Sequence, residues 1–345
     1  MSHPYRTLPP RAFWRSGTTP DSDGLIPDLY IPKFPIDAAT RIATAGSCFA
    51  QHIGRALRGA DCAFQDVEPP LRRMPADIAH RFGYGIYSAR YGNIYTTRQL
   101  RELLQEVENG TPDPKLVWQR DDRFFDALRP GVEPEGLASA SDVMDHRRFH
   151  LNRVAQLLGQ TDVFVFTLGL MEAWIDGPTG RTLPVCPGVI AGRFDPDQHR
   201  LHSFTYAEII DDLIQISAIL RQFQPDMRII LTVSPVPLTA TAQDLHVLTA
   251  TTGAKATLRA AAGQFVQGDP MADYFPAYEI VTSAVAGGPW FGPDQRSVSP
   301  AGVDRVMRSF LRAHGLSTAP AEGADDEAPE AEDHCEDILL QAFAP

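Results

Sequence analysis

The sequence predicts an α/β protein with a three-layer α/β/α architecture: a doubly wound parallel sheet carrying loop and helix insertions. Two observations support this prediction. Short apolar runs rich in β-branched residues alternate with longer stretches of helical period, as strands alternate with crossover helices. These runs also end in small or turn-forming residues, namely Gly46-Ser47, Gly169 and Ser234-Pro235. We therefore expect the strands to lie side by side with their carboxyl ends at one edge.

The apolar runs are short and compact. Residues 40–45 (TRIATA) form the first, and residues 162–167 (DVFVFT) read as a central strand that is buried on both faces. Residues 228–233 (RIILTV) form a third strand, and residues 274–281 form a fourth run. Stretches with apolar residues at steps of three and four, predicted as helices, lie between and beyond these runs: 49–57, 150–158, 205–223, 254–266 and 299–314.

The composition changes at both ends of the chain. Residues 1–38 are rich in proline and polar residues and are predicted to form an irregular arm over the main domain, which spans residues 39–315. Insertions at about 66–150 and 175–203 are rich in glycine, proline, arginine and aromatic residues, and we expect them to form a wall or lid over the ligand crevice.

The end of the chain is different again. Residues 316–334 are acidic, lack large apolar residues and are predicted to be a disordered linker. Residues 335–345 form a short amphipathic segment that docks on the main domain or on a protein partner.

Charge and cysteine content exclude several classes of function. The net charge is −12 and no Lys/Arg block is present, so nucleic acid and anionic membranes are poor partners. No run approaches the ~20 apolar residues of a membrane span, and the N-terminus lacks a secretory signal pattern. Four scattered cysteines without a C-x-x-C pair indicate a reducing compartment, so we expect a cytoplasmic location.

No metal or cofactor is expected. His146 and His150 are four residues apart, as in a helical metal pair, but no third ligand lies nearby in the sequence. The predicted partner is instead a small polar molecule held at the carboxyl ends of the strands, where doubly wound sheets bind their ligands.

Ser47 is the first candidate for chemistry at that edge. It follows the first strand and precedes a helix, whose N-terminal N–H groups and dipole favour a developing oxyanion. The alternative interpretation is that Ser47 only caps the helix, since serine is a preferred N-cap residue. Cys48 is either a second candidate nucleophile or a small buried residue.

Several blocks of sequence resemble one family. Gly46-Ser47-Cys48-Phe49-Ala50 spells the motif that names the GSCFA family, whose fold is similar to that of the SGNH/GDSL hydrolases. Further blocks of the same pattern, within a resemblance that extends from about Tyr30 to Phe310, are YGNIYT at 91–96, FTLGLMEAW at 166–174, SPVP at 234–237, YFPAYE at 274–279 and DQRSVS at 294–299.

The resemblance implies roles for individual residues. Ser47 would be the nucleophile, while Gly92, Asn93 and Gly169 would contribute to the oxyanion hole. Asn93 alternatively caps a turn, and Gly169 alternatively provides a positive φ after the strand. Glu172 would orient a catalytic partner, or it is a plain surface or N-cap acid.

The last block departs from the hydrolase pattern. Where those enzymes have Asp-x-x-His, this chain has Asp294 followed three residues later by Ser297, which we count among the substrate-binding candidates. Without that imidazole the base must come from elsewhere. His246 is the candidate retained, with His202 as another; both are alternatively structural or surface residues.

Lysine and arginine residues are further candidates at the predicted crevice. Lys255 becomes a base only if it is desolvated, and as a helix residue it is expected to be solvated or paired with an acid. The arginines at positions 90, 129, 193 and 296 are candidates for clamping an anionic substrate.

The sequence thus leads to two hypotheses. The first is a serine esterase or O-acyltransferase that uses Ser47 on an acylated saccharide or a similar small polar substrate. The second is a catalytically impaired binding protein that retains the crevice but lacks the usual Asp-x-x-His base. A third hypothesis makes Cys48 the nucleophile.

Overall fold

The computed structural model describes residues 3–60 and 62–316. Within these residues, five parallel strands form the central sheet in the order β10-β9-β5-β1-β2. β5 is buried along its whole length and pairs on both sides, as expected of a central strand. The strand bounds are β1 Arg41–Gly46, β2 Ala63–Phe64, β5 Val163–Leu168, β9 Arg228–Val233 and β10 Ala272–Tyr274.

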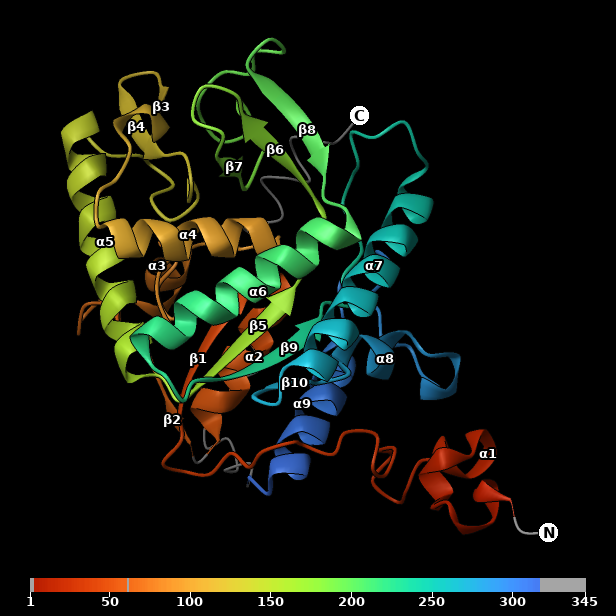
Figure 1. Cartoon of the computed structure of the whole chain (residues 1–345). Helices are drawn as coiled ribbons and strands as arrows, with labels where there is room; N and C mark the ends of the chain where they lie inside the picture. The colour runs from red at the N-terminus through yellow and green to blue at the C-terminus, as the bar shows by residue number, and fades with distance from the viewer. Residues whose placement is uncertain (1–2, 61, 317–345) are drawn as a thin grey trace.

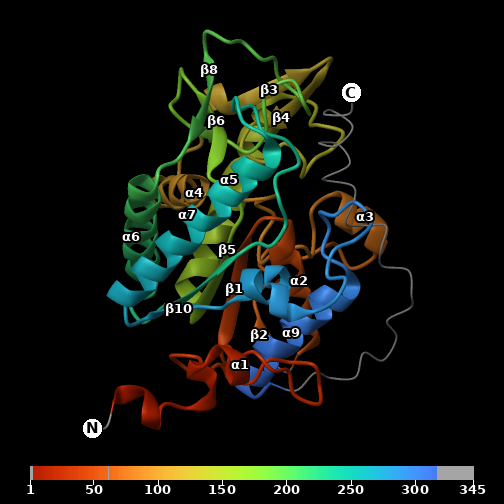
Figure 2. The same ribbon diagram turned by 90° about the vertical axis from the view of Figure 1, so that its right-hand side faces the viewer.

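Helices cover both faces of this sheet (Figures 1 and 2). Alternate residues of β5 face opposite layers: Phe164 and Phe166 pack with one group of helices, and Val163 and Val165 with the other. The first group is α4 Thr97–Asn109, α5 Ala140–Gln160, α6 Tyr206–Phe223 and α7 Val247–Gly268; the second is α2 Cys48–Gly59, α8 Ala277–Thr282 and α9 Pro300–His314. The predicted three-layer α/β fold is confirmed. No helix of the described chain combines the length and apolarity that crossing a bilayer requires.

Smaller elements rise beyond the carboxyl ends of the strands (Figure 1). Strands β6, β7 and β8 follow β5 in the chain, before α6, and form an antiparallel sheet in the order β7-β6-β8. Strands β3 and β4, which precede α5 in the chain, form a hairpin. The predicted insertion at 66–150 includes α4 and the first half of α5, which belong to the helical layer itself. The remaining bounds are α3 Ala76–Arg81, η3 Pro114–Leu116, β3 Val117–Arg120, β4 Arg123–Asp126, β6 Glu172–Asp176, β7 Thr182–Leu183, β8 His199–Ser203 and η4 Ala284–Ala286.

The fourth apolar run, residues 274–281, is mostly helix rather than strand. Strand β10 ends at Tyr274, and α8 begins at Ala277. Pro276 explains the change, because proline has no N–H for a strand ladder and is well suited to precede a helix. The apolar side chains that suggested a strand, Ile280 and Val281, are buried on the inner face of α8 instead.

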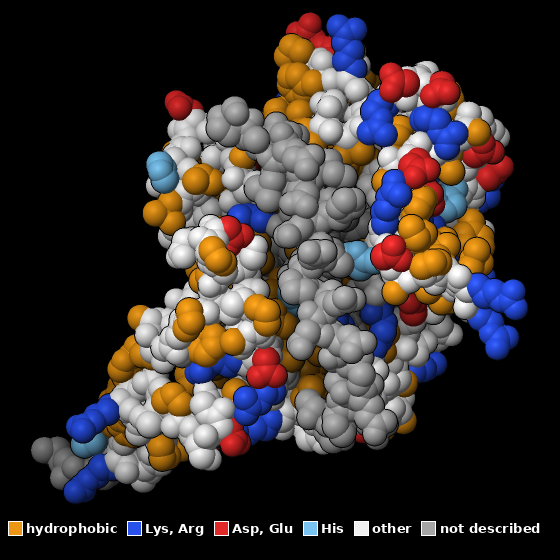
Figure 3. Space-filling view, turned by 180° about the vertical axis from the view of Figure 1, so that it is seen from behind, with side chains coloured by type: hydrophobic (Ala, Val, Ile, Leu, Met, Phe, Trp, Pro, Cys, Tyr) orange, Lys and Arg blue, Asp and Glu red, His pale blue; other side chains and the backbone are white. Residues whose placement is uncertain are grey.

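The N-terminal residues have two parts. Leu25, Phe34 and Ile36 are buried, and the Tyr30 hydroxyl donates a 3.0 Å hydrogen bond to Asp273 of β10, so this part packs on the domain. The preceding short helices, η1 Pro4–Thr7, η2 Pro10–Ala12 and α1 Trp14–Gly17, project from it with apolar side chains exposed (Figure 3). The predicted linker and amphipathic segment, after residue 316, lie outside the described residues.

Candidate active site

The site lies where the chain reverses its direction of travel across the sheet. From β1 the chain passes to β2 on one side, and later enters β5 on the other side of β1. Such a switch point leaves a crevice beyond the carboxyl ends of the two neighbouring strands. The register pairs Gly46 with Thr167, so the residues that follow, Ser47 and Gly169, emerge next to each other.

A pocket with a cavity volume of about 130 Å³ occupies this crevice. Ser47, Gly169 and Ser234, which the sequence predicts to converge, all line it. Its walls come from the turns after β1, β5 and β9, from the segment that follows β7 and from the loop before α9. The polar or titratable side chains in the lining include Ser47, Cys48, Tyr95, Glu172, Ser234 and Arg296.

Ser47 occupies the N-cap position of α2 without acting as a cap. Its backbone is extended, with φ −88° and ψ −174°, and its side chain makes no capping hydrogen bond. The residue is 5% exposed and faces the pocket. The hydroxyl therefore lies at the positive end of the α2 dipole, beside the first N–H groups of the helix, of which that of Ala50 donates to the Ser47 carbonyl oxygen at 2.8 Å.

Gly169 makes room for the Ser47 hydroxyl. A methyl group on its Cα would lie 2.8 Å from Ser47 Oγ and 3.2 Å from the Tyr95 carbonyl oxygen, so no larger residue fits without displacing Ser47. Gly169 does not have a positive φ, so clearance explains this glycine better than backbone strain does. Its N–H, assigned to the oxyanion hole by resemblance, donates instead to the Tyr95 carbonyl at 3.1 Å.

Gly92 and Asn93 lie in an adjoining pocket. Gly92 has a φ of +70°, which favours glycine, and Asn93 uses its amide to accept from the Tyr87 hydroxyl and to donate to the Tyr95 hydroxyl at 3.0 Å. Both residues line a cavity of about 80 Å³ with mainly apolar walls. Tyr95 also lines the Ser47 pocket, so the two cavities are neighbours, but the Asn93 amide is not part of the Ser47 lining.

Glu172, the first residue of β6, lines the same pocket as Ser47. Its Oε2 accepts hydrogen bonds from the Thr241 hydroxyl at 2.9 Å and from the Gln243 amide. These contacts tie the β9–α7 loop to β6, and the carboxylate remains in the pocket lining. The structure therefore shows Glu172 positioning a loop; none of the contacts described for it joins an imidazole.

The carboxylate of Asp294 accepts hydrogen bonds from Ser297. The Ser297 hydroxyl donates to Asp294 Oδ2 at 2.5 Å and its N–H donates to the same carboxylate, which closes a tight turn before α9. Partial burial opposes ionisation of Asp294, but the hydrogen bonds from Ser297 and from the Arg296 N–H, with the charge of Arg296, together lower its pKa. Asp294 is exposed, and of this turn it is Arg296 that lines the pocket.

Neither candidate histidine reaches the pocket lining. His246 is an exposed N-cap of α7, and its Nδ1 accepts the Leu248 N–H at 3.1 Å. His202, on β8, is paired with Glu208 at 2.8 Å. The structure thus brings Ser47, Gly169 and Glu172 together around one cavity, and leaves His246 outside it.

Lys255 lies behind this site, in contact with Gly169 of its lining. It is 1% exposed, and its Nζ donates to the Gly169 carbonyl at 2.8 Å. Burial and, to a smaller extent, the charge of Arg296 lower its pKa to about 7, against an opposing effect of Cys48. The expectation of a solvated or acid-paired Lys255 is wrong, because α7 turns this position into the core beneath Gly169.

The comparisons with known proteins bear on the whole domain. The sequence model of the GSCFA family matches residues 41–310, from the first residue of β1 to the last turn of α9. The chain belongs to the GSCFA family. The predicted family membership is confirmed, whereas no curated protein matches the chain.

Two solved structures show distant likeness to this GSCFA protein. One is "An Acetyl Xylan Esterase (Est2A) from the Rumen Bacterium Butyrivibrio proteoclasticus", at 12% identity and a TM-score of 0.31, covering 79% of this chain and 63% of the esterase. The other is a carbohydrate esterase family 2 enzyme with a carbohydrate-binding domain from Corynascus thermopiles (Myceliophthora fergusii), at 14% identity and a TM-score of 0.30, covering 83% of this chain and 69% of that one. The GSCFA chain therefore spans less than two thirds of the first of these proteins.

Two arginines predicted as substrate clamps have structural roles in this GSCFA protein. Arg90 and Arg129 are buried, and each has a carboxylate partner: Glu133 at 2.8 Å from Arg90 and Asp126 at 2.8 Å from Arg129. Their charges are thus neutralised inside the fold. Arg193 is exposed and outside the pocket, which leaves Arg296 as the arginine that lines it.

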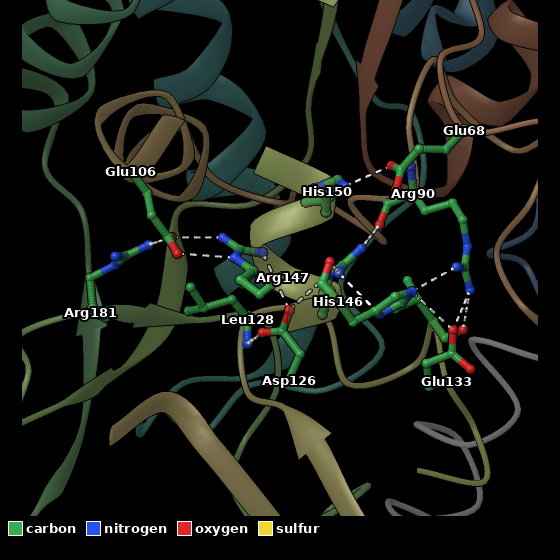
Figure 4. Close-up of polar contacts among 12 residues, drawn as sticks. Glu68, Arg90, Glu106, Asp126, Leu128, Glu133, His146, Arg147, His150 and Arg181 are labelled. Atoms are coloured by element: carbon green, nitrogen blue, oxygen red, sulfur yellow. Dashed lines mark hydrogen bonds and ion pairs between the residues drawn. The ribbon is translucent and has the colours of Figure 1, made fainter. Parts of the chain in front are cut away.

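These arginines belong to a buried polar network that the sequence did not reveal (Figure 4). Arg147 of α5 binds Glu106 of α4 at 2.7 Å and reaches Asp126 of β4, while His150 binds Glu68 at 2.7 Å. Burial opposes ionisation of Asp126, but the charges of Arg147 and Arg129 hold its pKa at about 2. The network joins segments far apart in the sequence, and its Arg129 lines the same cavity as Asn93.

Proposed function

We propose that this GSCFA protein is a serine esterase or O-acyltransferase that uses Ser47 as its nucleophile on an acylated saccharide or a similar small polar molecule. The observation that carries the proposal is the uncapped hydroxyl of Ser47. It stands at the N-terminus of a helix, faces a pocket and has space only because residue 169 is glycine. A serine whose role was structural would use this hydroxyl to cap α2.

The geometry suits attack on an ester. Ser47 Oγ would bond to the carbonyl carbon, and the carbonyl oxygen would become an oxyanion near the first turn of α2. Backbone N–H groups and the helix dipole there stabilise negative charge without any rearrangement. This arrangement supplies the nucleophile and the electrostatic stabilisation of the tetrahedral intermediate from one turn of chain.

The lining of the pocket supports a sugar as the alcohol part of the ester. Trp174 offers a half-buried aromatic surface, held by an edge contact with Phe194 at a centroid distance of 5.2 Å. Glu172 offers a carboxylate and Arg296 a guanidinium for hydroxyl groups. An apolar face with a few polar groups at its rim is the general form of a small-ligand site.

Two features of the proposal rest on the sequence. The cysteine pattern favours the cytoplasm, where transfer of an acyl group or trimming of an intermediate is more useful than digestion of an external polymer. A protein partner bound through residues 335–345 stays a prediction, since these residues lie outside the described chain.

The second candidate function is ligand binding without catalysis. It is favoured by Ser297, which stands where the hydrolase pattern has histidine and holds the Asp294 carboxylate in a turn. In this case the pocket would bind an acylated saccharide and leave it intact.

Turnover of esters by the full-length protein separates the two functions. The substrates are p-nitrophenyl acetate and acetylated methyl glycosides, and the variants are Ser47→Ala and, as a neighbouring control, Cys48→Ala. We expect Ser47→Ala to lose at least ~10³-fold in kcat/KM, as loss of a nucleophile does, and Cys48→Ala to keep the activity. Saccharide binding with no turnover would support the binding protein, and loss of turnover only in Cys48→Ala would make the thiol the nucleophile.

A further inference from the structure

Lys255 is buried in an apolar part of the core, which is unusual for a lysine. It lies on the inner face of α7 among Ala254, Leu258 and Ala261, all of them buried. Lysine is almost never fully buried unless its charge is compensated. Within residues 3–60 and 62–316, the one hydrogen bond described for its amino group is the 2.8 Å contact with the carbonyl oxygen of Gly169.

No carboxylate of the described residues forms an ion pair with this amine. The titratable groups that act on it are Arg296, from the loop before α9, and Cys48, the first residue of α2. The nearest layers hold acids that serve elsewhere: Asp212 of α6 binds Arg98 and Arg101, and Asp273 of β10 binds Tyr30. The surroundings of Lys255 therefore favour the uncharged amine.

Gly169 connects this amine with Ser47. One side of the residue abuts Ser47 Oγ, where a methyl group would come within 2.8 Å, and its carbonyl oxygen accepts from Lys255 Nζ. The hydroxyl and the amine thus both lie around a single peptide unit at the end of β5.

Resting on the proposed function, we propose that Lys255 is the proton acceptor for the Ser47 hydroxyl, directly or across one water molecule. It would take the place of the imidazole that serine hydrolases usually use, which position 297 lacks in this chain. The neutral amine suits the position, because it keeps an N–H for the Gly169 carbonyl and gains a lone pair for the serine proton. At a pKa of about 7 this neutral form is populated at physiological pH.

The reaction balances with water or a second alcohol as the co-reactant. As Ser47 Oγ bonds to the ester carbon, its proton passes to the Lys255 amine and the carbonyl electrons move to oxygen. Collapse of this intermediate breaks the bond to the sugar oxygen, which takes the proton from the Lys255 ammonium. Water or the second alcohol then gives a proton to Lys255 and attacks the acyl group, and Ser47 oxygen regains that proton when it leaves.

The test is the rate at which a fluorophosphonate probe labels Ser47 between pH 5.5 and 9, in the full-length protein. Lys255→Met removes the amine and keeps a long apolar side chain. Lys33→Met is the control, because exposed Lys33 also donates from its Nζ to a main-chain carbonyl, that of Val266 in the last turns of α7, and does not line the Ser47 pocket. Far-ultraviolet circular dichroism of each variant checks that it is folded.

We expect wild-type labelling to rise with pH with an inflection near 7, and Lys33→Met to follow it. Lys255→Met should label at least 100-fold more slowly and without the inflection, and methylamine should restore part of the rate to Lys255→Ala. Labelling of folded Lys255→Met at the wild-type rate with the same inflection would overturn the role of Lys255 and leave Ser47 as the nucleophile. A wild-type protein that is never labelled at Ser47 would overturn the proposed function itself, and this inference with it.

Discussion

Replacing Lys255 by methionine should stabilise the folded protein, although lysine makes a hydrogen bond there. The pKa of Lys255 is about 7 in the fold, mainly because of burial, against an ordinary lysine value of 10.5 in the unfolded chain. Between these pH values the unfolded chain holds a proton that the folded chain has released. The wild-type protein therefore gains stability as pH rises from 7 to 10.5, and its deficit is largest at pH 7 and below.

The size of the effect follows from that shift. A difference of 3.5 pKa units, from 10.5 to about 7, corresponds to about 5 kcal/mol of destabilisation at pH 7, at about 1.4 kcal/mol per unit. Loss of the hydrogen bond to the Gly169 carbonyl costs the variant about 1–3 kcal/mol. We expect Lys255→Met to be more stable than wild type by about 2–4 kcal/mol at pH 7, with the advantage shrinking by about 1.4 kcal/mol per pH unit above that.

Urea unfolding at pH 7, 8 and 9 measures this difference, because the titrations of all other groups cancel between wild type and variant. A Lys255→Met protein less stable than wild type by the same amount at every pH would refute the reasoning, since it would mean that the lysine is charged and compensated in the fold.

Three further predictions follow from the site and its supports. Gly169→Ala should slow labelling of Ser47 by at least ~10-fold, because the new methyl group lies 2.8 Å from the hydroxyl, while Gly253→Ala, on an open face of α7, should not; equal rates in both would show that the clearance is unimportant. Arg147→Met should lower the free energy of unfolding by about 1–3 kcal/mol in urea, since buried Glu106 loses a hydrogen-bonded cation while Arg181 stays paired with it and Arg129 with Asp126, and an unchanged free energy would contradict this. His246→Ala should keep ester hydrolysis within about twofold of wild type because the ring is exposed outside the pocket; a 100-fold loss would reinstate it as the base.

Much of the fold was accessible from local patterns. Strand β5 is buried on both faces, so its sequence is continuously apolar, and the amphipathic period of α6 shows which face meets the sheet. The fourth run, residues 274–281, resembles a strand because Ile280 and Val281 are as apolar as strand residues. Pro276 nevertheless ends the extended segment and precedes helix α8. Turn residues therefore mattered more there than hydrophobicity.

The site was accessible in part. Parallel pairing alone brings the ends of β1 and β5 together, so Ser47 and Gly169 were predictable neighbours. What Gly169 provides was not predictable, because clearance for a hydroxyl depends on three-dimensional distances and φ does not report it. Lys255 was misjudged for a similar reason: a single polar residue on a long helix reveals neither its depth nor its partner.

The burial of Arg90 and Arg129 could not be predicted from the sequence. Arg90 and Arg129 lie in irregular segments, where a charged residue is expected at the surface. Their carboxylate partners, Glu133 and Asp126, are neutralising only because the chain folds back between α4 and α5. Buried ion pairs of this kind have no periodic signal in a sequence.

The position at which a fluorophosphonate attaches tests the central claim most directly. Peptide mass spectrometry of the labelled protein should find the adduct on the peptide that contains residues 46–50, localised to Ser47 and absent from Ser47→Ala. An adduct on another residue, or none at all from a folded protein that still binds an acetylated glycoside, would contradict the account and leave the pocket as a binding site.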